Sequence, residues 1–194
     1  NAIGAYGAVD FNRLTNRNGL SNSQVNAIFK DQKGYVWFGT QSGLDRFDGF
    51  RMKEFLYDDG NPNSISNNSV DEIQQAIDGS LWIHTSVGYC IYQYDKERFD
   101  RKPEEWLKTI GVDGPPYKLL IDSKKNMWMS VYGQGIYFVD VKNMTAFLFP
   151  FSKTKSRSSL PDYQVSCIRE DNGQAVVTFD NGVICRLDGY AQQV

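Results

Sequence analysis

The sequence holds a single histidine, His84, among its 194 residues. One imidazole excludes a metal site with two histidine ligands and leaves no spare partner for a catalytic triad. The three cysteines, Cys90, Cys167 and Cys185, lack the paired spacing of metal-binding cysteines. Cys167 and Cys185 fall on predicted strands with another strand between them, about 9–10 Å apart, which is too far for a disulfide. We therefore expect three buried thiols, no metal and no cofactor.

Long apolar runs and an excess of one charge are also missing. No stretch approaches the roughly 18 apolar residues of a membrane span. The 21 basic residues nearly balance the 23 acidic ones, leaving a net charge of −2, so we expect binding neither to nucleic acid nor to an anionic membrane. The densest basic cluster, Lys153, Lys155 and Arg157, is interpreted as a solvated loop. No phosphate-binding glycine loop is present.

What the sequence does contain is a repeat. Three of its four tryptophans, Trp37, Trp82 and Trp128, occupy one slot of a unit about 45 residues long. The match extends to the surrounding residues, so that 31–47 aligns with 76–92 and, with one inserted residue, with 122–138. Short β-like runs at this period are typical of propeller blades. We predict an all-β fold, a partial β-propeller of about four units of about 45–48 residues, with four-stranded antiparallel blades.

Each unit begins with an alternating strand, followed by a tight turn and the strand that carries the tryptophan; in the first two units this turn contains Gly34 or Gly79. A second glycine turn leads to the third strand, and the outermost strand is the least regular. The fourth unit has valine, within Val176-Val177, at the tryptophan slot, and Phe11–Leu14 resembles an outer strand of a preceding unit. The tryptophans are expected to be core residues between blades. The second glycine turns are at Gly43, Gly88, Gly135 and Gly182.

These patterns divide the chain into blades with two short flanks. We predict an N-terminal extension or cloning remnant at 1–10, blades over 11–190 and a tail at 191–194. Two connections break the period: a polar linker at 57–69, and an insertion at 101–117 whose Pro103–Lys108 segment is expected to form a helical turn. The repeat units are predicted at about 20–57, 65–100, 117–149 and 160–190.

The first unit closely resembles the two-component regulator propeller repeat. The residues that carry the resemblance are Gly19-Leu20-Ser21, Val25, Ile28, Asp31, Gly34, Val36-Trp37-Phe38-Gly39-Thr40, Gly43-Leu44 and Phe47. Asn61–Val70 is similar to the linker between repeats of that family. Two departures stand out, because His84 replaces the glycine of the Trp-x-Gly-Thr pattern and Ser130-Val131 replaces its Gly-Thr.

The resemblance implies a function in signalling. Members of the family form periplasmic sensor domains of hybrid two-component systems, in which a histidine kinase follows a membrane span, and many resemble sensors of oligosaccharides. We therefore expect a periplasmic, non-enzymatic module that binds an oligosaccharide and contacts the remaining blades and the kinase region of a longer chain. The alternatives are a lyase or glycosidase on a propeller, which needs paired acids or a partnered base, and a structural set of blades. Unpaired flanking strands also predict a homodimer; the alternative is a small disc of four or five blades with one blade incomplete.

Candidate ligand-binding residues follow from the chemistry of sugars, which offer apolar C–H faces and polar rims to aromatic, amide and carboxylate groups. Trp106, Tyr117 and Tyr132 are predicted to lie in loops outside the repeat slots, with Asp113 nearby. His84 is a further candidate, on the same strand face as Trp82. The competing interpretation is packing for the aromatic residues and a hydrogen-bonded strand position for His84.

Overall fold

The computed structural model describes residues 14–152 and 160–192, which form four sheets and little helix. Neither Phe11–Arg13 of the expected N-terminal strand nor the basic cluster of Lys153, Lys155 and Arg157 falls within the described residues. Blade 1 consists of β1 (Val25–Lys30), β2 (Val36–Thr40), β3 (Leu44–Phe47) and β4 (Met52–Phe55). Blade 2 consists of β5 (Val70–Gln75), β6 (Leu81–Thr85), β7 (Gly88–Gln93) and β8 (Arg98–Asp100).

The other two blades depart slightly from the expected four antiparallel strands. Blade 3 consists of β9 (Pro116–Ile121), β10 (Met127–Val131), β11 (Gly135–Asp140), β12 (Thr145–Ser152) and the short β13 (Leu160–Pro161). Its last strand pairs in parallel with β12. Blade 4 consists of β14 (Val165–Asp171), β15 (Gln174–Phe179) and β16 (Ile184–Leu187). Two short helices complete the described elements, η1 (Asn16–Asn18) and α1 (Pro103–Thr109).

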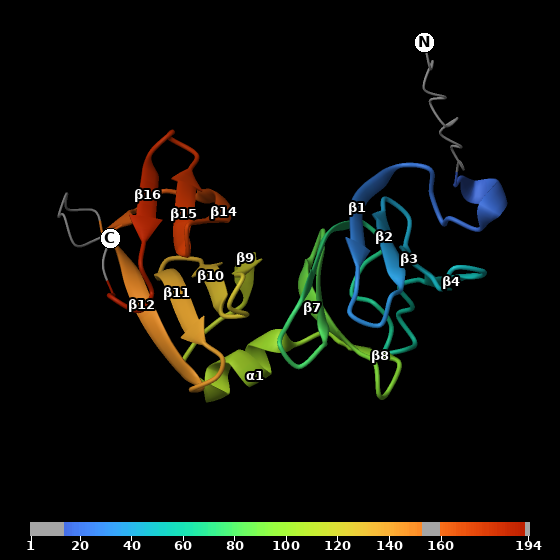
Figure 1. Ribbon diagram of the computed structural model, residues 1–194, viewed down its shortest axis with the longest axis horizontal. Helices are drawn as coiled ribbons and strands as arrows, with labels where there is room; N and C mark the ends of the chain where they lie inside the picture. The colour runs from blue at the N-terminus through green and yellow to red at the C-terminus, as the bar shows by residue number, and fades with distance from the viewer. Residues whose placement is uncertain (1–13, 153–159, 193–194) are drawn as a thin grey trace, which may run out of the picture.

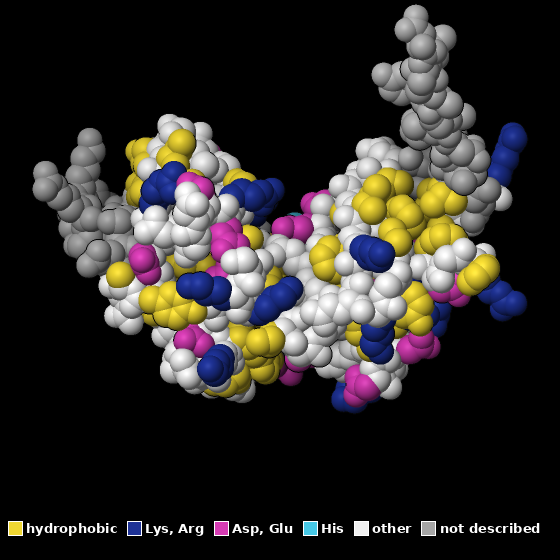
Figure 2. Space-filling view, viewed as in Figure 1, with side chains coloured by type: hydrophobic (Ala, Val, Ile, Leu, Met, Phe, Trp, Pro, Cys, Tyr) yellow, Lys and Arg dark blue, Asp and Glu magenta, His cyan; other side chains and the backbone are white. Residues whose placement is uncertain are grey.

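The blades follow one another around an arc (Figure 1). The innermost strands β1, β5, β9 and β14 lie side by side in chain order, while α1 lies beside blades 2 and 3. Figure 2 shows that the molecule is hollowed between blade 1 and blade 4, at opposite ends of the arc. The arrangement confirms the predicted β-propeller.

The core is divided among the junctions between blades. Trp37 packs with residues of blades 1 and 2, Trp82 with blades 2 and 3, and Trp128 with blades 3 and 4. Their side chains are 0%, 2% and 2% exposed, which confirms that they are core residues. A β-sheet buries its apolar side chains by packing one face against the face of another sheet. Each repeat therefore needs a neighbour to complete its core.

The cysteine prediction is only partly right. All three thiols are free, but only Cys90 is buried. Cys167 lies on β14 and Cys185 on β16, and both are partly exposed. Both belong to the last described blade, where the described residues supply a packing neighbour on one side only. The expected helical turn is confirmed, because α1 starts at Pro103 with Glu104 and Glu105 in its first turn.

Candidate ligand-binding site

In blades 1 and 3, a carboxylate six residues before the tryptophan holds the indole. Asp31 Oδ2 accepts a hydrogen bond from Trp37 Nε1 at 2.7 Å, and Asp122 Oδ2 accepts one from Trp128 Nε1 at 3.2 Å. The other carboxylate oxygen, Oδ1, accepts a hydrogen bond from a backbone N–H of the following turn. The donor is Tyr35 N in blade 1 and Asn126 N in blade 3. Both carboxylates are buried. We call this arrangement the carboxylate–indole pair.

Blade 2 keeps the tryptophan but lacks the carboxylate, because Ala76 occupies the equivalent position. The turn itself is unchanged: the hydrogen bond from Ala76 N to Ser80 O measures 3.0 Å, as does that from Asp31 N to Tyr35 O. The backbone therefore presents Ala76 where Asp31 stands in blade 1. Among the described residues, Trp82 Nε1 has no hydrogen-bond partner, although the Trp82 side chain is 2% exposed.

A second substitution enlarges the same junction. In blade 2, Tyr94 follows β7, and its hydroxyl donates to Asp31 Oδ2 of blade 1. Its ring lies 6.2 Å from that of Trp37, at 84°. The residue of blade 3 that corresponds to Tyr94 is Val141. Leu81 pairs with Tyr92 in blade 2 and Met127 pairs with Val139 in blade 3, and Tyr94 and Val141 each lie two residues after these partners. A tyrosine and an aspartate that fill the junction of blades 1 and 2 are thus replaced by valine and alanine between blades 2 and 3.

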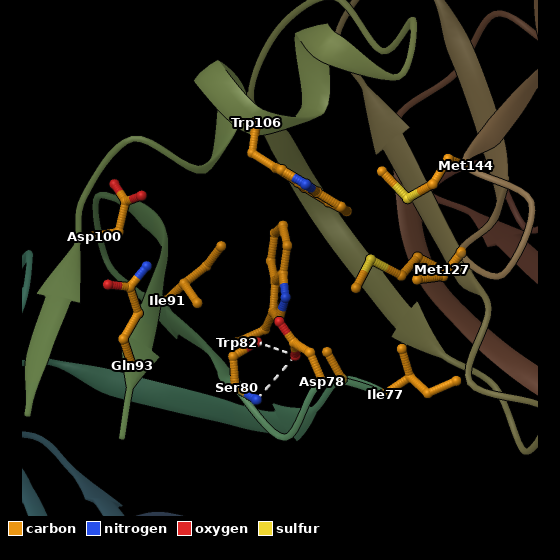
Figure 3. A pocket seen from close by; sticks show the side chains of 12 residues that line it. Ile77, Asp78, Ser80, Trp82, Ile91, Gln93, Asp100, Trp106, Met127 and Met144 are labelled. Carbon is orange, nitrogen blue, oxygen red and sulfur yellow. Dashed lines mark hydrogen bonds between the residues drawn. The ribbon is translucent and has the colours of Figure 1, made fainter. Parts of the chain in front are cut away.

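The space left by these smaller side chains is a cavity of about 420 Å³ between blades 2 and 3, which we call the interblade pocket. Figure 3 shows Trp82 rising between Ile91 and Met127 toward Trp106, which descends from α1. The two indoles meet edge to face, with ring centroids 6.1 Å apart and planes at 64°. The pocket is lined by Ala76, Ile77, Asp78, Ser80, Trp82, Ile91, Gln93, Asp100, Trp106, Met127, Val141 and Met144.

The helix α1 positions Trp106 by burying its opposite side. Leu107 is fully buried in the core that contains Trp82, and Ile110 closes the C-terminal end of the helix. Proline at the first helical position and acids in the first turn favour the helix at this point. The half-buried Trp106 is thereby fixed at the pocket wall.

The polar groups of the interblade pocket are acidic or neutral. Asp78, Ser80, Gln93 and Asp100 contribute oxygen and amide groups, and no lysine, arginine or histidine is among the lining residues. Asp78 Oδ1 accepts from Ser80 N at 3.0 Å and from Ser80 Oγ at 2.7 Å, as the dashed lines in Figure 3 show. The arrangement can hold a molecule with an apolar face against the indoles and hydroxyl groups toward the rim.

His84 lies in a different place, among the inner strands. Its Nδ1 is 2.6 Å from Asp71 Oδ1, so it is a hydrogen-bonded strand residue. Tyr89 donates to Glu72 Oε2 at 3.0 Å beside it, and a cavity of about 210 Å³ also reaches Lys118 of β9. Although burial raises the pKa of Asp71, the hydrogen bond and attraction from His84 and the charge of Lys118 hold the pKa below its usual range.

The acidic partners of His84 were not foreseen from the sequence. Asp71 occupies a β-bulge near the start of β5, between Val70 and Glu72, which pair with Thr85 and His84. A bulge re-aims the side chain of its extra residue, and here it brings Asp71 to the imidazole. Strand alternation alone places Asp71 and Glu72 on opposite faces, so no local signal predicted that both would border one cavity.

The remaining candidates form a third group. The rings of Tyr117 and Tyr132 stack with centroids 4.0 Å apart and planes at 19°. The expectation that Tyr117 lies in a loop is wrong, because it is the bulge residue of β9 and its hydroxyl accepts from Val165 N of blade 4 at 3.2 Å. Asp113 contributes its backbone oxygen to Gln134 Nε2. Of the five candidate ligand-binding residues, only Trp106 reaches the interblade pocket.

Comparison with known proteins agrees with the fold. The family model for the two component regulator propeller matches residues 19–42. The histidine kinase P4 of Formosa agariphila is 32% identical over 138 residues, which are 66% of this chain and 10% of that protein. The extracellular domain of the hybrid two component system BT3049 from B. thetaiotaomicron superposes with a TM-score of 0.67 at 22% identity, over 94% of this chain and 25% of that one.

A second solved structure gives the same result. The extracellular domain of the one component system BT4673 from B. thetaiotaomicron superposes with a TM-score of 0.60 at 22% identity, over 88% of this chain and 24% of that chain. This chain thus spans about a quarter of each solved relative and a tenth of the kinase. Over the described residues, no helix combines the length and apolarity that a membrane crossing needs.

Fold and pocket define a set of β-propeller blades with a ligand-sized cavity at one junction. Residues 19–42 are a two-component regulator propeller repeat, so the resemblance inferred from the sequence is confirmed. The solved relatives are extracellular domains of signalling systems.

Proposed function

We propose that this chain is a periplasmic ligand-sensing part of a two-component receptor and binds an oligosaccharide non-covalently in the interblade pocket. The confirmed repeat and the extracellular domains that share its fold support the signalling role. The observation that carries the ligand proposal is the pair of indoles, Trp82 and Trp106, which meet edge to face in the wall of a cavity with carboxylate and amide groups at its rim.

The physical reason lies in the two kinds of surface that a sugar presents. The C–H face of a pyranose packs against an indole, and its hydroxyl groups need hydrogen-bond partners at the edge. A cavity of about 420 Å³ lies within the usual range for sites of small organic ligands. The neutral and acidic oxygens of Asp78, Gln93 and Asp100 are suitable acceptors for hydroxyl protons.

The position of the pocket suggests how binding could be transmitted. Its walls come from blade 2, from blade 3 and from α1, which joins them in the chain. A ligand that contacts all three stabilises one arrangement of the blades over others. In a longer receptor, that bias would pass to a histidine kinase outside this chain.

The proposal is tested by titrating the chain with neutral disaccharides, namely maltose, cellobiose and lactose, in an isothermal calorimeter. We expect at least one to bind, and Trp106→Ala to weaken that binding at least tenfold. Tyr132→Ala is the matched control, because Tyr132 is 65% exposed and lies outside the pocket. No binding by any of the three sugars, or equal loss in both variants, would contradict the proposal.

Self-association is a separate proposal that rests on the unpaired blade flanks. Exposed strand edges and apolar side chains favour pairing with a second copy, and Ile28 on β1 is 69% exposed. Light scattering over a wide concentration range is expected to show a dimer. A monomer throughout that range would contradict it.

A further inference from the structure

Two blades contain only one member of the carboxylate–indole pair, and they show what the remaining group does without its partner. Blade 4 keeps the carboxylate, Asp171, but has Val176 at the tryptophan slot, and Asp171 Oδ2 pairs with Arg186 Nη1 at 2.6 Å. Blade 2 keeps the indole but has Ala76, and its N–H finds no partner among the described residues. The carboxylate without an indole has found a substitute partner, whereas Trp82 has not.

An N–H group costs about 1–3 kcal/mol when it is shut off from both water and an acceptor. Two side-chain atoms of the described residues are fully enclosed and lack a hydrogen-bond partner, namely Asp45 Oδ1 and Ser130 Oγ. Trp82 Nε1 is not one of them, although the Trp82 side chain as a whole is only 2% exposed. The nitrogen is therefore reachable from the interblade pocket, which Trp82 lines. A molecule in that pocket can satisfy it, as the Asp31 and Asp122 carboxylates satisfy their indoles.

We infer that the ligand of the interblade pocket supplies the missing acceptor, an uncharged hydroxyl or ring oxygen that binds Trp82 Nε1. The inference rests on the proposed function and adds its chemistry: the pocket selects neutral sugars over anionic ones. Trp82 fixes the orientation of the sugar, while Trp106 provides the packing face.

The charge of the lining supports the preference for a neutral ligand. Asp78 and Asp100 lie at the pocket, and no basic side chain lines it. The adjacent Lys102 is engaged elsewhere, since its Nζ lies 3.2 Å from Glu105 Oε1. A uronic acid or a sulfated sugar would bring a further negative charge beside these two carboxylates without a basic group to pair it, which is unfavourable.

The decisive variant is Ala76→Asp, which restores the carboxylate in a turn with the same backbone hydrogen bonds as in blade 1. The new carboxylate is expected to accept the Trp82 N–H and to occupy the place of the ligand oxygen. Affinity for the neutral disaccharide that binds the parent chain should then fall at least tenfold, while circular dichroism stays unchanged. Ala76→Leu is the control, because leucine branches at the same carbon as aspartate, fills at least as much space and offers no acceptor.

The indole N–H signals provide a second measurement that needs no ligand. In a ¹H–¹⁵N spectrum, each of the four tryptophans gives one indole signal, assigned by substitution to phenylalanine. Exchange with deuterium is expected to be faster at Trp82 than at Trp37 and Trp128, and slower in Ala76→Asp. Addition of the disaccharide should shift the Trp82 signal and leave that of Trp37 in place.

The outcomes separate the two proposals. If Trp106→Ala abolishes binding but Ala76→Asp retains it, or if Ala76→Leu weakens it equally, the acceptor inference is wrong and the proposed function stands. If digalacturonic acid binds as well as the neutral disaccharides, the charge preference is wrong. If none of these sugars binds the parent chain, the proposed function itself fails, whatever the exchange rates show.

Discussion

Blade 1 and blade 2 place a tryptophan in the same slot, with the same turn before it, and surround it differently. Trp37 is held by Asp31, stacked on Phe55 with centroids 5.6 Å apart and covered by Tyr94 of the next blade. Trp82 has none of these partners and stands beside a cavity of about 420 Å³. The difference shows that a repeat fold can gain a pocket by losing side chains while its backbone stays the same.

A second contrast at the same junctions involves the bulge near the start of each inner strand. In blades 1 and 3 the bulge residue reaches the next inner strand, as Asn26 Nδ2 donates to Val70 O and Tyr117 accepts from Val165 N. In blade 2 the bulge residue is Asp71, and the next inner strand begins with Pro116, which has no N–H to donate. Asp71 binds His84 instead, so blade 2 differs from blade 1 at both its tryptophan and its inner edge.

The largest expected effect compares the two tryptophans directly. Trp37→Ala should destabilise the chain by about 3–5 kcal/mol, because it leaves a cavity in a packed aromatic core and removes the partner of Asp31. Trp82→Ala should cost less, since one side of that ring already borders the interblade pocket. Urea denaturation followed by circular dichroism measures both. Equal losses would show that the cavity beside Trp82 is closed in solution.

The next prediction concerns the carboxylate. Asp31→Ala should destabilise by about 2–3 kcal/mol, because Trp37 Nε1, Tyr35 N and the Tyr94 hydroxyl all lose their acceptor inside the core. Asp78→Ala is the control in blade 2, since Asp78 is exposed and bonds only Ser80 among the described residues. We expect it to cost below about 0.5 kcal/mol. A small effect of Asp31→Ala would mean that the pair does not stabilise blade 1.

A third comparison tests the glycine of the Trp-x-Gly-Thr pattern. A Cβ at Gly39 would lie 2.7 Å from Val70 Cγ1, so Gly39→Ala should destabilise by about 1–3 kcal/mol through overpacking. Blade 2 has His84 in that slot, with a side chain 20% exposed, and His84→Ala should cost below about 1 kcal/mol. Thermal unfolding of the two variants is the measurement. The reverse order would contradict the steric account of Gly39.

The fold was predictable because its signals are local. Alternating strands, a recurring tryptophan and turns at Gly34 and Gly79, whose φ angles are 88° and 86°, each act within a few residues. The strands that carry Trp82 and Trp128 therefore lie where the repeat predicts them, at Leu81–Thr85 and Met127–Val131.

The pocket was not predictable, because it depends on what surrounds Trp82 in space. The alignment of units already showed Ala76 opposite Asp31, but its meaning requires knowing that the Asp31 carboxylate reaches the indole. Val141 comes from a different repeat, and its effect follows from blade packing. Trp106 was named as a candidate because it lies outside the repeat slots, whereas Trp82 was assigned to the core alone and the edge that lines the pocket was missed.

The smallest expected effect is the pH dependence at the inner edge of blade 2, where Asp71 has a lowered pKa because the attraction of His84 and Lys118 outweighs its burial. A carboxylate with a lower pKa in the folded chain stabilises it fully above the unfolded value of 3.8, and this contribution is lost as the pH falls below that value. Asp71→Asn should therefore flatten the fall in stability below about pH 4, by less than about 1 kcal/mol because the side chain is 55% exposed. Urea denaturation at several pH values measures it, with the parent chain as the reference. An unchanged slope in Asp71→Asn would mean that the pair with His84 does not form in solution, and blade 2 would then differ from blade 1 at its tryptophan alone.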